Sequence, residues 1–145
     1  MSRLQSLEPK FVEAVPKDRE DGVLYISITY GTMVHNCACG CGGKVTTPIG
    51  PARWRFTYDG DSVSVCPSIG NWSYPCRSHY WIGHNRIKWA SSWSEERIAA
   101  GRVRGRSERK RFAEAKANGE EFVTHEDQEV PPKSRRRSLR RLFRI

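Results

Sequence analysis

The sequence lacks any apolar run long enough to cross a bilayer. Its first residues, MSRLQSLEPKFVEAVP, contain no apolar core of a secretory leader. No internal repeat is present, and the His-Glu-x-x-His motif of helical zinc peptidases is absent. We therefore expect one modest domain in the reducing cytoplasm, where disulfides are rare.

The cysteines favour metal binding over disulfides. There are five, so one would be left over from pairing, and Cys37, Cys39 and Cys41 lie too close in sequence to pair with one another. A second pair, Cys76 and His79, would present two ligands from one tight turn. Thiolate-rich clusters bind soft or borderline metals, most often zinc. The sequence predicts one Zn²⁺ ion where two loops meet.

The candidate ligands outnumber the positions on the metal. A closed structural zinc site takes four protein ligands, whereas a catalytic site takes three and leaves one position for water. The candidates are His35, Cys37, Cys39, Cys41, Cys76 and His79. The favoured tetrahedral set is Cys39, Cys41, Cys76 and His79, with Cys37 as the main substitute. His35 would then lie near the metal without binding it.

Alternating and turn-rich segments predict a mainly β fold, α+β overall. Val23–Tyr30 alternates like a half-buried strand that continues through Gly31. The Asp59–Gly60 pair between two alternating runs predicts a hairpin. Further short strands are expected at 44–47, 53–58, 62–66, 79–82 and 87–89. These elements predict a small antiparallel domain, whose limited core a zinc site would stabilise.

Composition divides the chain into four segments. We expect a flexible lead-in at 1–10, a zinc-binding β domain at 11–93 and a charged helix at 94–118, with a candidate break near Gly105. Fourteen of the 25 Lys and Arg residues lie in 101–145. The segment 119–145 is expected to be a basic, disordered tail, whose residues 133–145 are candidates for binding nucleic acid or an anionic membrane surface.

Three sequence blocks resemble one bacterial family: FVEAVP, GVLYISITYGTMVHNCACGCGGKVTTPI and WRFTYDGDSVSVCPSIGNWSYPCRSHYWI. This family of small proteins carries a domain of unknown function and is encoded beside ubiquitin-like proteins and their activating and conjugating enzymes. The resemblance covers residues 11–90. It implies metal-dependent processing or removal of the ubiquitin-like protein, with that protein, its conjugates or its conjugating enzymes as partners. The family's motif residues fall on Glu13, His35, Cys37, Cys39, Cys41, Cys76, Arg77, Ser78 and His79.

The expected chemistry is that of a zinc peptidase or isopeptidase. Glu13 would act as the general base, and His35 would orient or protonate the leaving amine. Arg77 and Ser78 would support the thiolates or a substrate carbonyl. Several thiolates would reduce the Lewis acidity of the metal, which favours the alternative: a zinc-stabilised module that binds a ubiquitin-like protein or conjugating enzyme without chemistry.

Overall fold

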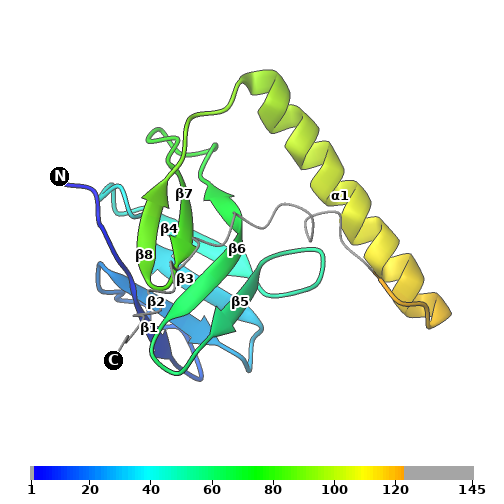
Figure 1. Ribbon diagram of the computed structural model, residues 1–145, viewed down its shortest axis with the longest axis horizontal. Helices are drawn as coiled ribbons and strands as arrows, with labels where there is room; N and C mark the ends of the chain where they lie inside the picture. Colours follow the sequence, from blue (N-terminus) through cyan, green and yellow to red (C-terminus); the bar gives the residue numbers. More distant parts are fainter. Residues whose placement is uncertain (1, 123–145) are drawn as a thin grey trace, which may run out of the picture.

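The computed structural model describes residues 2–122, which form eight strands followed by one helix (Figure 1). The expected mainly β fold with a C-terminal helix is confirmed. The elements are β1 (Glu8–Phe11), β2 (Val23–Ser27), β3 (Thr32–Asn36), β4 (Lys44–Pro48), β5 (Arg55–Tyr58), β6 (Val63–Gly70), β7 (His79–Gly83), β8 (Arg86–Trp89) and α1 (Glu95–Asn118).

The strands form two four-stranded sheets, β1-β2-β3-β4 and β5-β6-β7-β8. Among the described strands, only β1 and β2 pair in parallel. Apolar side chains from both sheets are removed from water in one core, which supplies the main driving force for folding. The buried core includes Leu24, Ile26, Met33, Val45, Val63, Val65, Ile69, Tyr80, Ile82 and Ile87.

The N-terminal segment belongs to the domain and is not the loose lead-in expected for residues 1–10. Leu7 is fully buried, and Glu8–Phe11 form β1 against β2. The Leu7 amide donates to the Asn85 carbonyl at 2.7 Å, and the Ile87 amide donates to the Gln5 carbonyl at 2.8 Å. The segment therefore contacts both sheets.

Strand β2 ends earlier than its alternating pattern predicts. The chain turns after Ser27 and returns as β3, leaving Ile28 and Tyr30 exposed. The Ser27 hydroxyl accepts a hydrogen bond from the Tyr30 amide at 3.2 Å, and Gly31 takes a left-handed φ of 60°. A serine side chain that bonds the backbone, followed by glycine, favours this turn over a longer strand.

The second sheet contains the hairpin predicted at Asp59–Gly60. Strand β6 runs beyond the expected end at residue 66 and reaches Gly70. Its pairing with β7 shifts register between Val65 and Ile69, so β6 contains extra residues relative to its partner. Such bulges bend a strand and re-aim its side chains.

Helix α1 is continuous from Glu95 to Asn118, without the interruption expected at Gly105. The Ser94 hydroxyl caps its first turn, as predicted, by accepting from the Arg97 amide at 3.2 Å. The helix extends as a separate limb beside the sheet of β5–β8 (Figure 1). Within residues 2–122, no helix combines the length and apolar character needed to cross a membrane. The tail prediction for 123–145 lies outside the described residues.

Candidate functional site

Four cysteines from two loops meet at one place. Cys37, Cys39 and Cys41 lie at the end of β3 and in the loop that follows, and Cys76 lies in the loop before β7. All four Sγ atoms lie within 4.8 Å of one another. The Sγ–Sγ distances are 3.4 Å for Cys37–Cys39, 3.9 Å for Cys37–Cys76 and 3.8 Å for Cys41–Cys76.

This donor set fits a tetrahedral metal. A Zn–S distance of about 2.3 Å implies Sγ–Sγ distances of about 3.8 Å. The amides of Cys41 and Gly43 donate to the Cys39 and Cys41 sulfurs, each at 3.4 Å, as expected where backbone dipoles stabilise thiolates. Four sulfurs would fill a tetrahedral shell and leave no position for water.

The thiols also require a cation in order to ionise together. Burial raises the pKa of Cys37 and raises that of Cys39 to about 12. Burial opposes ionisation of Cys76 too, but hydrogen bonds with the Ser78 hydroxyl and amide and with the Cys39 and Cys41 thiols together outweigh it and lower the pKa to about 7. One thiolate therefore forms near neutral pH, whereas a second or third requires a positive charge beside it.

Ser78 contacts two sulfurs of the cysteine cluster. Its Oγ lies 3.0 Å from the Cys37 Sγ and 3.5 Å from the Cys76 Sγ, and it accepts from the Asn71 amide group at 2.9 Å. Arg77 points elsewhere: its guanidinium forms a 2.7 Å ion pair with Glu95 at the start of α1.

The two residues predicted to be catalytic beside the metal lie in different environments. His35 is fully buried, and its Nε2 lies 2.7 Å from the Tyr80 hydroxyl. Burial lowers the His35 pKa to about 4, so its ring is neutral. Glu13 is exposed in the loop after β1, and its carboxylate is not among the groups gathered around the sulfurs.

His79 lies outside the sulfur group, which corrects the favoured ligand set: Cys37 takes the place given to His79. Both His79 ring nitrogens have other partners. Nδ1 lies 2.8 Å from the Ser91 carbonyl oxygen, and Nε2 lies 2.9 Å from the Ser68 hydroxyl. Because Ser78 points toward the cysteines, the next side chain of the extended chain points away from them.

These contacts fix the His79 tautomer. A carbonyl oxygen only accepts, so Nδ1 carries the proton and donates to Ser91. Nε2 is then a free acceptor facing the Ser68 hydroxyl. A serine hydroxyl held against an imidazole whose other nitrogen is fixed by an acceptor is the arrangement of a serine nucleophile and its general base.

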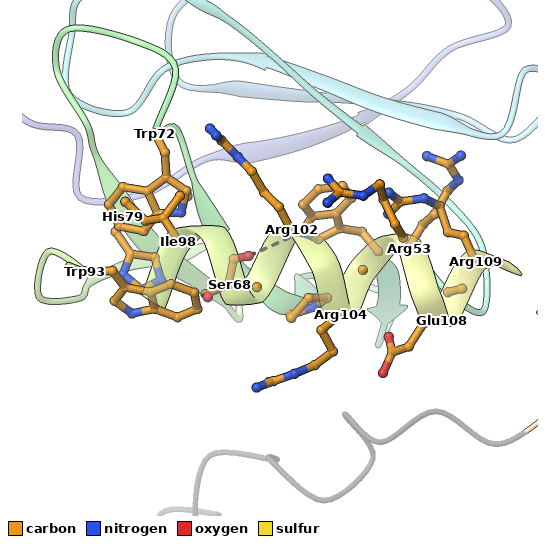
Figure 2. Close-up of a pocket in the computed structure, with 17 residues that line it drawn as sticks. Arg53, Ser68, Trp72, His79, Trp93, Ile98, Arg102, Arg104, Glu108 and Arg109 are labelled. Atoms are coloured by element: carbon orange, nitrogen blue, oxygen red, sulfur yellow. Dashed lines mark hydrogen bonds between the residues drawn. The ribbon is translucent and has the colours of Figure 1, made fainter. Parts of the chain in front are cut away.

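Aromatic side chains hold the His79 ring in place. The Trp72 and Trp93 rings lie 5.0 and 5.1 Å from it, centroid to centroid, and stack on each other at 5.6 Å. Ser68 is half-buried in the β6 bulge, where its side chain leaves the regular register. Both residues line a pocket of about 400 Å³ that is bordered by α1 (Figure 2).

Residues 11–90 match the family described as "Bacterial ubiquitination-like system serine protease (BubE)". The chain belongs to this family. The matched segment contains all four clustered cysteines, Ser68 and His79, but it ends before α1. The family description places the chain among the proteases of a bacterial ubiquitination-like system, in agreement with the resemblance seen in the sequence. No curated protein and no solved structure matches the chain.

The BubE description names a serine protease, whereas the sequence led us to expect zinc-dependent catalysis. Sequence reasoning missed Ser68 and the carbonyl of Ser91. Ser68 lies in the block PSIGNW, which was used only to recognise the family. Its position within that block, upstream of a histidine, is the one signal that could have pointed to it.

Proposed function

We propose that the chain is a serine peptidase or isopeptidase that processes a ubiquitin-like protein or removes it from conjugates. Ser68 is the nucleophile, and His79 is the general base. The observation that carries this proposal is the 2.9 Å contact between Ser68 Oγ and His79 Nε2, with Nδ1 held 2.8 Å from the Ser91 carbonyl, beside a pocket. The family description supports it.

The steps follow from this geometry. Ser68 Oγ attacks the scissile carbonyl carbon while its proton passes to His79 Nε2. The Ser91 carbonyl accepts from Nδ1–H and stabilises the resulting imidazolium. When the tetrahedral intermediate collapses, Nε2–H protonates the leaving amine and Ser68 is left acylated. A water molecule, deprotonated by Nε2, then hydrolyses the ester and restores the hydroxyl.

In this proposal the four cysteines hold one structural Zn²⁺ ion. The ion would tie the loop after β3 to the turn that leads from Cys76 to His79. Since only Arg77 and Ser78 separate that ligand from the general base, the metal site would set the position of the His79 ring. Glu13 and His35 have no part in the chemistry of this mechanism.

The test uses the ubiquitin-like protein of the same bacterial system, carrying a C-terminal extension. The zinc-loaded chain should release the extension, and Ser68→Ala should abolish release while keeping its metal. Ser92→Ala, an exposed serine nearby, is the matched control and should retain activity. Cleavage at an undiminished rate by Ser68→Ala would refute the proposal. If Ser68→Ala stays active and zinc removal abolishes cleavage while the protein stays folded, zinc chemistry is favoured instead.

A further inference from the structure

The pocket beside Ser68 continues along α1 and becomes strongly basic. Figure 2 shows Trp72, His79 and Trp93 at one end, with Arg53 and Arg109 at the other. Arg102 lies between these two ends. Among residues 2–122, the arginines that line the pocket are Arg53, Arg102, Arg104, Arg106 and Arg109, and the acidic residue in the lining is Glu108.

Among residues 2–122, no carboxylate forms an ion pair with these arginines; Arg77 pairs with Glu95, and Asp59 contacts His84. Arg102 makes one long contact, 3.4 Å from Nη2 to the Ser73 hydroxyl. Clustered like charges repel one another, and a basic concavity attracts anionic ligands.

The helix leaves room for a ligand between the two ends. Gly101 and Gly105, one turn apart, both line the pocket. Glycine within a helix is less stable than alanine, so packing around Gly101 and Gly105 is the first place to look for why glycine occurs there. A Cβ on Gly101 would lie 3.4 Å from the Trp93 ring, and one on Gly105 would lie 3.2 Å from Arg109 Nη1. The helix therefore presents no side chain to the pocket at these two positions.

The side chain of Glu108 also indicates that a ligand binds in this pocket. The residue is only 5% exposed, yet its Oε1 is buried and has no hydrogen-bond partner among the described residues. A buried carboxylate oxygen without a donor is costly. A main-chain N–H of a chain bound in the pocket would satisfy it.

We propose that α1 selects substrates with acidic side chains near the cleaved bond. This inference rests on Ser68 and His79 being the catalytic pair. Ile98 lies at the catalytic end of the helix, and Arg102 and Arg109 follow four and eleven residues later. At 1.5 Å per helical residue these offsets are about 6 and about 16 Å.

An extended peptide advances about 3.3 Å per residue. Arg102 therefore binds a carboxylate about two residues from the cleaved bond. Arg109, together with Arg53, binds one about five residues away. Because the BubE match ends at residue 90, α1 lies outside the matched segment, which contributes only Arg53 to this proposed selectivity.

The test is cleavage of a diverse peptide library, read by mass spectrometry. The wild-type chain should favour Asp or Glu by about tenfold at the two positions, since paired charges are the stronger hydrogen bonds. Arg109→Glu should reverse the preference to Lys or Arg at the farther position only. Lys110→Glu, the matched control, carries the same change of charge on an exposed residue outside the pocket and should cleave like wild type.

A second readout covers the case in which short peptides are not cut. Labelling of Ser68 by a fluorophosphonate should slow about tenfold in the presence of an alanine peptide carrying two Glu residues three positions apart. The matching Gln peptide should not slow it, and Arg109→Glu should abolish the protection. Equal effects of the two peptides, or no acidic preference in cleavage, would overturn the inference.

The two proposals fail in different ways. If Ser68 is labelled and cleavage occurs without acidic selectivity, the role of α1 is refuted and the catalytic assignment stands. If the fluorophosphonate leaves Ser68 unmodified in the metal-loaded wild-type chain, the catalytic assignment itself is refuted, and the inference falls with it.

Discussion

Metal affinity should fall steeply as the pH is lowered, because zinc and protons compete for the same sulfurs. Burial raises the pKa of Cys37 and raises that of Cys39 to about 12, so both thiols are protonated at neutral pH. Cys76, with a pKa of about 7, is about half ionised there. Binding as a thiolate cluster must therefore release at least the two protons of Cys37 and Cys39, together with part of the Cys76 proton.

Each released proton makes affinity change tenfold per pH unit. At least two released protons give a change of at least about 100-fold per unit above the Cys76 pKa, and the Cys76 proton raises this to at least about 1,000-fold per unit below it. The sign follows from the thiols: lowering the pH protonates them and weakens binding. Loss of zinc should also release the turn that carries His79, so peptidase activity should fall over the same acidic range.

The assay is competition for zinc against a chromophoric chelator whose own pH dependence is known. It is run at about pH 6, 7 and 8. Cys41→Ser should weaken binding because it removes a ligand, whereas Cys66→Ser, outside the cluster, is the control and should not. An affinity that changes less than about tenfold per pH unit would refute the thiolate assignment.

Two substitutions test the packing around the site. Tyr80→Phe removes the hydroxyl 2.7 Å from His35 Nε2 and leaves this buried nitrogen without a partner. The free energy of unfolding, measured in urea, should therefore drop by about 1–3 kcal/mol. A drop below about 0.5 kcal/mol would contradict this. Gly70→Ala places a Cβ against the Trp72 indole nitrogen, closer than a side chain can approach, and should displace that ring from His79. It should lower kcat at least about tenfold with metal content unchanged, whereas Gly83→Ala, which has nothing within 4 Å, should behave like wild type.

Local sequence patterns predicted much of the fold. The turn pair Asp59–Gly60 located the β5–β6 hairpin, and Ser94 marked the start of α1 within one residue. Local patterns gave wrong predictions where hydrogen bonds or contacts outside the pattern determined the end of a strand or the members of the core. The Ser27 hydroxyl and the conformation of Gly31 turned an apparently continuous strand into a hairpin, and Leu7 became a core residue through contacts with distant strands.

The cysteine cluster was predictable because close spacing restricts where three sulfurs can lie. His79 was misassigned because Cys76-x-x-His79 resembles a pair of metal ligands in sequence. In space, the chain becomes extended at Ser78, so consecutive side chains face opposite ways and the imidazole meets Ser68 instead. The contact between Ser68 and His79 depends on a bulge in β6, which no pattern in the sequence predicts. Serine is common and carries no spacing signal of its own.

The proposed chemistry depends on the activation of Ser68 by His79. The most direct measurement is covalent labelling of the zinc-loaded chain by a fluorophosphonate, with the modified residue identified by peptide mass spectrometry. We expect one adduct, on Ser68, that is lost in His79→Ala although the metal content stays the same. An adduct on another serine, or labelling of Ser68 that is unchanged in His79→Ala, would contradict it.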